Sequence, residues 1–211
     1  MKIEILYPEI CTLYGDKGNT MYLQKCLPDA EFVTTGLNEK PLFLKENIDM
    51  VYMCSMSEKS QELVLDRLMQ YKDEIAACMK DGKALFLLVG NSMELLGDYI
   101  KREDGTRVTG LGVVPGMYSV RQAPNRFNTL IKAKFNDMTL IGYTSRFAHT
   151  YGIPDDMTFC KVEIGQGSNP DTMNEGICKN RVIATYIHGP LLIQNPDFVH
   201  YLLEKLDAPM K

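Results

Sequence analysis

Residues 83–97 have the sequence KALFLLVGNSMELLG, in which the apolar run Ala84–Val89 leads directly into Gly90. An apolar run of this length is typical of a strand that is covered on both faces, as in a parallel sheet. Gly90 favours a tight turn, and Asn91 followed three residues later by Glu94 is typical of a helix start. The stretch therefore predicts a buried strand, a sharp turn and a helix, an arrangement that presents reactive side chains in many enzymes.

Upstream of this stretch, predicted strands and helices alternate. Strands are expected near residues 2–7, 31–35 and 49–54, and a short helix is expected over 20–26. The clearest helix is Gln61–Lys80, where apolar residues recur at three- and four-residue steps, and it ends before Gly82. This alternation predicts an α/β fold with a parallel sheet.

Downstream, the pattern changes to short β-like pieces separated by Gly, Pro and Asn. Strands are expected over 108–114, 129–135, 139–143, 159–164 and 181–186, followed by a helix over 196–206. We therefore expect a three-layer α/β core with a β-rich second half. Because neither a repeat nor a low-complexity linker is visible, residues 1–211 are expected to form a single domain.

Composition excludes several classes of protein. The chain has 211 residues with 23 Lys+Arg against 27 Asp+Glu, and a formal net charge of −4 disfavours nucleic acid as a partner. Apolar runs fall short of the ~20 residues that span a bilayer, so we expect no membrane segment. The first residues are strand-like, so we expect no signal peptide, and the six irregularly spaced cysteines fit free thiols. These features favour the reducing cytoplasm.

Candidate chemistry lies in the loops that follow the strands, because open α/β sheets bind ligands beyond the carboxyl ends of their strands. His188 follows a predicted strand and precedes a Gly-Pro turn, which makes it the best candidate for a catalytic base, although a plain turn histidine fits equally well. Cys54 and Ser92 are weaker candidates for a nucleophile. Metal-ligand spacing is absent, so we expect neither a metal nor another cofactor.

Several blocks, taken in order along the chain, resemble class I glutamine amidotransferases of the cobyric acid synthase (CobB/CobQ) type. The likeness is greatest to the amidotransferase subunits of lipid II isoglutaminyl synthases. The matching blocks are Tyr7-Pro8, LYGDKGN at 13–19, ELLG at 94–97, GLG at 110–112, and ATYIHGPL at 184–191 with Asn195-Pro196.

The resemblance implies a flavodoxin-like core in which a cysteine at the strand–helix turn attacks the side-chain amide of glutamine. A histidine then transfers protons, backbone amides of a glycine-rich loop stabilise the oxyanion, and ammonia passes to a partner. His188 matches that histidine, and Arg126 falls near an arginine implicated in glutamine binding. For the lipid II enzymes the partner is a Mur-ligase-like, MurT-type ATP-dependent synthetase.

This chain departs from the family pattern at the positions that carry the chemistry. Gly90 stands where the nucleophilic cysteine belongs, and the glycine-rich oxyanion block is replaced by CSMSE at 54–58, with Gln61 retained. A Glu-Asn-His stretch of the family becomes Thr-Ser-Arg at 144–146. Ser55, Asn91, Gln61 and Arg126 remain as expected lining of a glutamine pocket. Loss of the nucleophile alone predicts loss of nearly all covalent turnover.

Three hypotheses follow for the function. The first is a non-catalytic subunit that docks on an amidating synthetase as a scaffold or regulator. The second is an active glutaminase that uses Cys54 or Ser92 as its nucleophile. The third is an amino-acid-binding sensor whose pocket, lined by His188 and Arg126, holds glutamine without turning it over. Both a peptidoglycan and a cobyrinate-like acceptor are compatible with the blocks.

Overall fold

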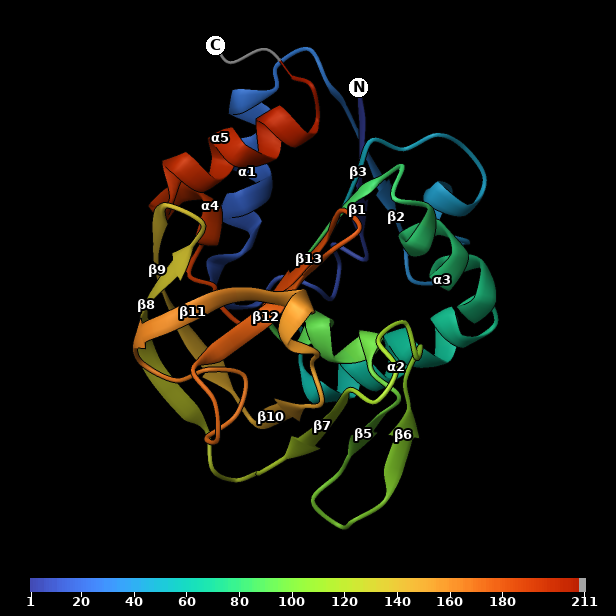
Figure 1. Cartoon of the computed structure of the whole chain (residues 1–211). Coiled ribbons are helices and arrows are strands. Elements are labelled where there is room, and N and C mark those ends of the chain that lie inside the picture. Colours follow the sequence, from blue (N-terminus) through green and yellow to red (C-terminus); the bar gives the residue numbers. More distant parts are fainter. Residues whose placement is uncertain (209–211) are drawn as a thin grey trace.

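A computed structural model describes residues 1–208 and contains two sheets, one of nine strands and one of four (Figure 1). The larger sheet has the order β2-β1-β3-β4-β13-β12-β11-β8-β9 and the smaller one β10-β7-β5-β6. Their bounds, in chain order, are β1 Lys2–Leu6, β2 Glu31–Thr35, β3 Met50–Met53, β4 Leu85–Val89, β5 Tyr99–Lys101, β6 Arg107–Thr109, β7 Tyr118–Arg121, β8 Phe127–Phe135, β9 Met138–Arg146, β10 Ala148–Tyr151, β11 Thr158–Ile164, β12 Asn174–Lys179 and β13 Val182–Thr185.

The predicted central strand is confirmed as β4, which lies between β3 and β13 and runs parallel to both. All five of its residues are buried, as its unbroken apolar sequence requires. The strands β2, β1, β3, β4 and β13 form the parallel half of the sheet, whereas β12, β11, β8 and β9 add an antiparallel half. Loops after the parallel strands therefore meet at one edge, as expected for an α/β ligand site.

Helices cover both faces of this sheet. They are α1 (Lys17–Cys26), α2 (Glu58–Met69), α3 (Lys72–Asp81), α4 (Leu191–Gln194) and α5 (Pro196–Lys205), with short 3₁₀ segments η1 (Leu13–Gly15), η2 (Leu42–Leu44), η3 (Gly90–Leu96) and η4 (Asp155–Met157). In Figure 1, α1, α4 and α5 gather on one side of the sheet, and α2 and α3 lie on the other. The predicted three-layer α/β, flavodoxin-like class is thus confirmed. Within the described residues, no helix is both long and apolar enough to cross a membrane.

Three details of the sequence prediction were wrong. The strand expected over 108–114 is limited to β6, because the chain leaves the sheet after Thr109 and turns at Gly112, whose φ is +63°. The single helix expected over 61–80 is divided into α2 and α3, because Tyr71 adopts non-helical angles of φ −113° and ψ 13° between them. The expected α-helix after Val89 is the 3₁₀ segment η3, whose N-terminal residue is not capped by a side chain. Asn91 is therefore not a helix cap, and its side chain has another partner. Gly82 ends α3 in the left-handed conformation, as predicted.

Candidate functional site

The strand–turn–helix connection places Gly90 at the carboxyl end of β4 with φ +71°, a conformation that glycine adopts without strain. A Cβ atom built on Gly90 would lie 2.0 Å from Oγ and 2.8 Å from Cβ of Ser55. Atoms cannot approach that closely, so the side chain of Ser55 fills the space that a side chain at position 90 needs. The turn has the backbone form of a nucleophile elbow but holds no side chain at its tip.

Ser55 is fixed in this position by Asp16, which lies between η1 and α1. The serine Oγ donates to the Asp16 Oδ2 at 2.8 Å, and both side chains are buried. Burial raises the pKa of Asp16 to about 6, although its hydrogen bonds to Ser55 and Gly189 partly oppose the shift. The hydrogen bond to Asp16 therefore holds the Ser55 hydroxyl in place next to Gly90. Its position is the space that a side chain at position 90 would need.

His188 lies just after β13 in an aromatic enclosure. Its ring stacks on Tyr14 with centroids 4.4 Å apart and meets the edge of Tyr143 at 4.5 Å. Its Nε2 accepts a hydrogen bond from the backbone N–H of Ser145 at 3.0 Å, and burial lowers its pKa to about 4. At neutral pH the imidazole is uncharged, so its proton lies on Nδ1, which has no hydrogen-bond partner among the described residues. Nε2, the one imidazole nitrogen that can accept a proton, thus already accepts a hydrogen bond from the backbone.

Asn91 and Gln61 connect the turn to the neighbouring loop and helix. The Asn91 side chain accepts from the Met56 N–H at 3.0 Å and donates to the Met56 carbonyl at 2.7 Å. Gln61 donates from Nε2 to the Asn91 carbonyl at 2.7 Å and to Glu94 Oε2 at 3.0 Å. The polar atoms of both side chains are hydrogen-bonded within the protein. Asn91 and Gln61, which the sequence analysis expected to line a pocket, therefore brace the turn against the neighbouring loop and helix.

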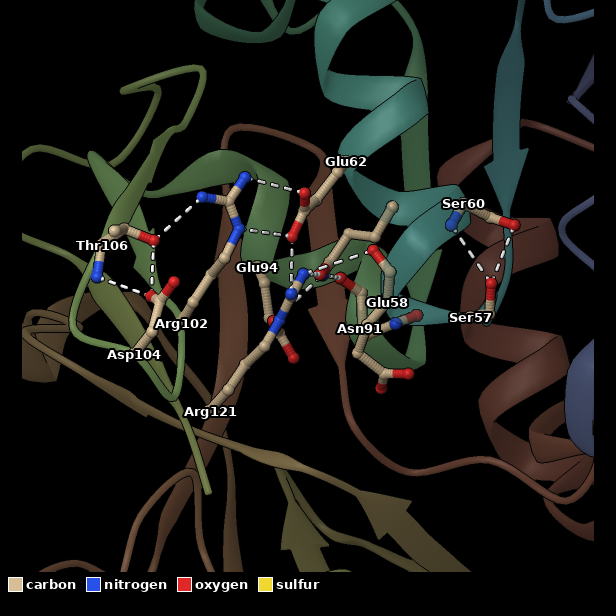
Figure 2. A network of polar contacts seen from close by, with 11 residues as sticks. Ser57, Glu58, Ser60, Glu62, Asn91, Glu94, Arg102, Asp104, Thr106 and Arg121 are labelled. Atoms are coloured by element: carbon tan, nitrogen blue, oxygen red, sulfur yellow. Dashed lines mark hydrogen bonds and ion pairs between the residues drawn. The ribbon is translucent and has the colours of Figure 1, made fainter. Parts of the chain in front are cut away.

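A charged cluster extends this bracing toward the smaller sheet (Figure 2). Arg121 of β7 donates to Glu62 at 2.6 Å and to Gln61 Oε1 at 3.0 Å, and Arg102 donates to the same glutamate through Nε and Nη2 at 2.9 and 2.8 Å. The hydrogen bond from Arg102, followed by that from Arg121, lowers the pKa of Glu62 to about 2. This cluster could not be predicted from the sequence, because Arg102 and Arg121 lie far from α2 along the chain and belong to no local sequence motif.

Glu94 is the buried end of the same network, with 2% of its surface exposed. Its Oε1 accepts from the Tyr186 hydroxyl at 3.0 Å, and that hydroxyl lies 2.6 Å from Thr150 Oγ1. Burial raises the pKa of Glu94 to about 7, against the opposing effect of its two hydrogen bonds. The carboxyl therefore connects η3 to β10 and to the segment after β13, and its charge is disfavoured.

Arg126 is exposed and lies in the loop between β7 and β8. Its guanidinium carbon lies 4.5 Å from the ring centroid of Phe147 and 6.0 Å from that of Tyr14, the ring that stacks on His188. The structure thus brings the predicted Arg126 and His188 to the same aromatic ring, with the arginine on the outside. Tyr14 itself carried no sequence signal beyond its place in the LYGDKGN block.

The alternative nucleophiles are held by backbone carbonyls. The Cys54 thiol donates to the carbonyl of Cys11 at 2.5 Å, and burial raises its pKa. The Ser92 hydroxyl donates to the carbonyl of Val89 at 2.7 Å and is completely buried. Neither side chain hydrogen-bonds to His188 in the part of the chain that the structure describes. Over residues 1–208, no group of three or more His, Cys, Asp or Glu side chains could hold a metal ion.

The parallel sheet, the elbow at Gly90 and the histidine after β13 together define the architecture of a class I glutamine amidotransferase. Solved structures support this fold. A crystal structure of a glutamine amidotransferase aligns with a TM-score of 0.63 and 13% identity over 98% of this chain and 99% of that one. A second, from Thermotoga maritima, gives a TM-score of 0.56 and 14% identity over 99% of this chain and 86% of that one.

The chain belongs to the family of CobB/CobQ-like glutamine amidotransferase domains, which matches residues 2–196. It is also similar to lipid II isoglutaminyl synthase (glutamine-hydrolyzing) subunit GatD of Streptococcus pneumoniae, with 27% identity over 96% of this chain and 79% of that protein. GatD of Staphylococcus aureus is 27% identical over 92% of this chain and 79% of its own length. The resemblance inferred from the sequence blocks is therefore confirmed.

Proposed function

We propose that this protein is a non-catalytic amidotransferase subunit that acts as a scaffold or regulator of an ATP-dependent amidating synthetase. The observation that carries the proposal is at Gly90, where the nucleophile is missing and Ser55 fills its space. A covalent mechanism needs a nucleophile and a base that act as a unit. The hydrogen bond from the Ser145 N–H to His188 Nε2 adds support, because it occupies the atom that would accept the proton.

The proposed partner is a Mur-ligase-like synthetase of the MurT type. Two GatD proteins are similar to this chain along most of its length, and their names describe subunits of a lipid II isoglutaminyl synthase. Lipid II is accordingly the favoured acceptor, with a cobyrinate-like acceptor as the alternative. A single domain and a cytoplasmic location, the latter favoured by the six unpaired cysteines, remain predictions.

The proposal predicts that the purified protein releases no glutamate from L-glutamine, with or without a MurT-type partner. Glutamate is measured in wild type, His188→Ala and His200→Ala, the last being an exposed histidine on α5. We expect the three preparations to give the same background rate, since neither histidine then contributes to turnover. A rate that is lost only in His188→Ala would refute the proposal. Co-purification with the partner tests the scaffold role separately.

An active enzyme with a non-standard nucleophile is the second candidate, and its test is labelling by a glutamine-analogue electrophile. Modification of Cys54 or Ser92, located by mass spectrometry, would support it. The buried thiol and hydroxyl, each donating to a carbonyl, favour no labelling. An amino-acid sensor is the third candidate, favoured by the position of Arg126 and His188 near the same ring, that of Tyr14. Thermal stabilisation by glutamine without product would support it.

A further inference from the structure

The smaller sheet carries a row of stacked tyrosines across three of its strands. Tyr99 of β5, Tyr118 of β7 and Tyr151 of β10 lie in register. The ring centroids are 5.1 Å apart for the first pair and 5.4 Å for the second, and interplanar angles of 14° and 18° make the rings nearly parallel. All three side chains are partly exposed. Because β10 is an edge strand, Tyr151 is the last ring of the row.

One face of the Tyr151 ring is covered by Tyr118, and the other is turned away from β7. On that side, β10 is bordered by a loop that contains Ser168 and Asn169. The Thr150 N–H donates to the Ser168 carbonyl at 2.9 Å, and Asn169 Nδ2 donates to the Thr150 carbonyl at 2.7 Å. The uncovered face of the ring therefore lies on the side of β10 where this loop runs.

A cavity of about 250 Å³ borders Tyr151 and this loop. Its polar lining includes Asp155, Thr158, Ser168, Asn169, Asp171 and Asn174. The volume is far larger than the ~30 Å³ that one water molecule occupies in the liquid, so a ligand of several heavy atoms fits. Among the described residues the lining includes neither Gly90 nor His188, so this cavity is separate from the turn after β4.

Two hydroxyls in the lining have unused capacity for hydrogen bonds. Thr158 Oγ1 is buried and has no partner among the described residues. Ser168 is only 2% exposed, and its Oγ accepts from the Gly176 N–H at 3.1 Å, but over residues 1–208 no acceptor takes its proton. Buried polar groups are rarely left in this state, so both hydroxyls suit a ligand that offers hydrogen-bond partners.

The exposed part of the lining provides acceptors. Neither Asp155 nor Asp171 forms an ion pair within residues 1–208, and both side chains are exposed. The Asp171 N–H donates to Asn169 Oδ1 at 2.9 Å, which fixes the backbone of this loop. Burial, and then the charge of Asp171, raise the pKa of Tyr151, so this carboxylate lies near the phenol. The cavity thus combines an aromatic ring, carboxylates and hydroxyl donors.

This combination discriminates between classes of ligand. An anion is repelled by the two carboxylates, and the described lining contains no Lys, Arg or His to offset them. An ammonium group only donates hydrogen bonds, so it leaves the proton of Ser168 without an acceptor. A sugar hydroxyl both donates and accepts, so it can bind a carboxylate and the serine together. The C–H groups on one face of a sugar ring also pack well on the negative face of an aromatic ring.

We propose that this cavity binds a neutral carbohydrate, with one face of a sugar ring packed on Tyr151 and its hydroxyls bonded to Asp171, Ser168 and Thr158. The site lies outside the region around Gly90 and His188, and it requires neither glutamine turnover nor a synthetase partner.

The test is saturation-transfer-difference NMR on the full chain, which detects weak binding. Thermal unfolding is unsuitable, because sugars are excluded from protein surfaces and stabilise proteins in general. The probes are D-glucose, D-galactose and N-acetyl-D-glucosamine, with sorbitol as a polyol without a ring and putrescine as a diamine. We expect at least one of the three sugars to receive saturation at its ring C–H protons, and sorbitol and putrescine to receive none.

Variants then locate the site by titration with the sugar that responds. In Tyr151→Ala and in Asp171→Ala the Kd should rise roughly tenfold, because each variant removes a principal contact. Tyr99→Ala is the matched control for the first, since Tyr99 is the opposite end of the row and does not line the cavity. Asp137→Ala, at an exposed position after β8, is the control for the second. Both controls should keep the Kd of the wild type.

The exposed Asp171 side chain can be removed without disturbing the core, so Asp171→Ala carries the test if Tyr151→Ala does not fold. Absence of a signal from all three sugars, or an equal signal from sorbitol, would overturn the proposal. Binding of putrescine alone would show that the cavity takes an amine. An unchanged Kd in Asp171→Ala and Tyr151→Ala would place the sugar elsewhere. None of these results bears on glutamate release, so the proposed function is judged independently.

Discussion

Replacing Gly90 by cysteine, the nucleophile that we propose is missing there, is expected to destabilise the protein by roughly 3 kcal/mol instead of creating an enzyme. The new Cβ would lie 2.0 Å from Ser55 Oγ, and position 90 has φ +71°. Both the clash and the left-handed backbone oppose a side chain. The measurement is the free energy of unfolding in urea under reducing conditions, combined with glutamate release. We expect the single variant to be less stable and inactive.

The clash can be separated from the backbone strain. Gly105 also has a positive φ, +85°, but a Cβ there meets no atom within 4 Å, so Gly105→Cys is expected to cost only about 1 kcal/mol. Ser55→Gly should rescue part of the stability of Gly90→Cys, since the two side chains compete for one space. The double-mutant cycle should give a coupling energy of about 1–2 kcal/mol. Strict additivity, or equal costs at Gly90 and Gly105, would show that Ser55 does not fill the nucleophile's space.

Replacing Glu94 by glutamine is expected to raise stability at alkaline pH and to leave it nearly unchanged near pH 5. Burial raises the folded-state pKa of Glu94 from 4.5 to about 7. Between these values the folded protein retains a proton that the unfolded chain has released, so the contribution of Glu94 to stability falls as pH rises from about 4.5 to 7. The full difference has an upper limit of about 3 kcal/mol. The Glu94→Gln variant lacks this pH-dependent loss of stability, because an amide does not ionise. Its amide can still donate to Tyr186 and accept from Gln61.

Urea unfolding at several values between pH 5 and pH 8 tests this prediction. Other groups also titrate there. Asp16, with its raised pKa, lowers stability as pH rises, and His149 and His188, with lowered pKa values, raise it. The difference between wild type and Glu94→Gln cancels these terms, and Glu204→Gln, at an exposed position of α5, should show no such difference. A pH-independent difference for Glu94→Gln would contradict the buried, proton-retaining carboxyl.

Features that depend on residues adjacent in the chain could be predicted from the sequence alone. The unbroken apolar run before Gly90 predicted β4, because a strand covered on both faces exposes no polar position. Gly82 predicted the end of α3, because glycine adopts a positive φ without cost. The histidine block around His188 could also be identified from the sequence, because it is a short run of adjacent residues. These local signals predicted the fold class and the family.

The side chain that fills the space at Gly90 and the contacts of His188 depend on the packing of distant parts of the chain. Ser55, in the loop after β3, lies against Gly90, and Ser145 of β9 donates to His188, in each case across a long stretch of chain. The hydrogen bond from Arg121 to Gln61 likewise has no periodic or spacing signature. Such contacts depend on the register and packing of whole elements, and a side chain's hydrogen-bond partners are set by whichever atoms that packing brings within about 3 Å.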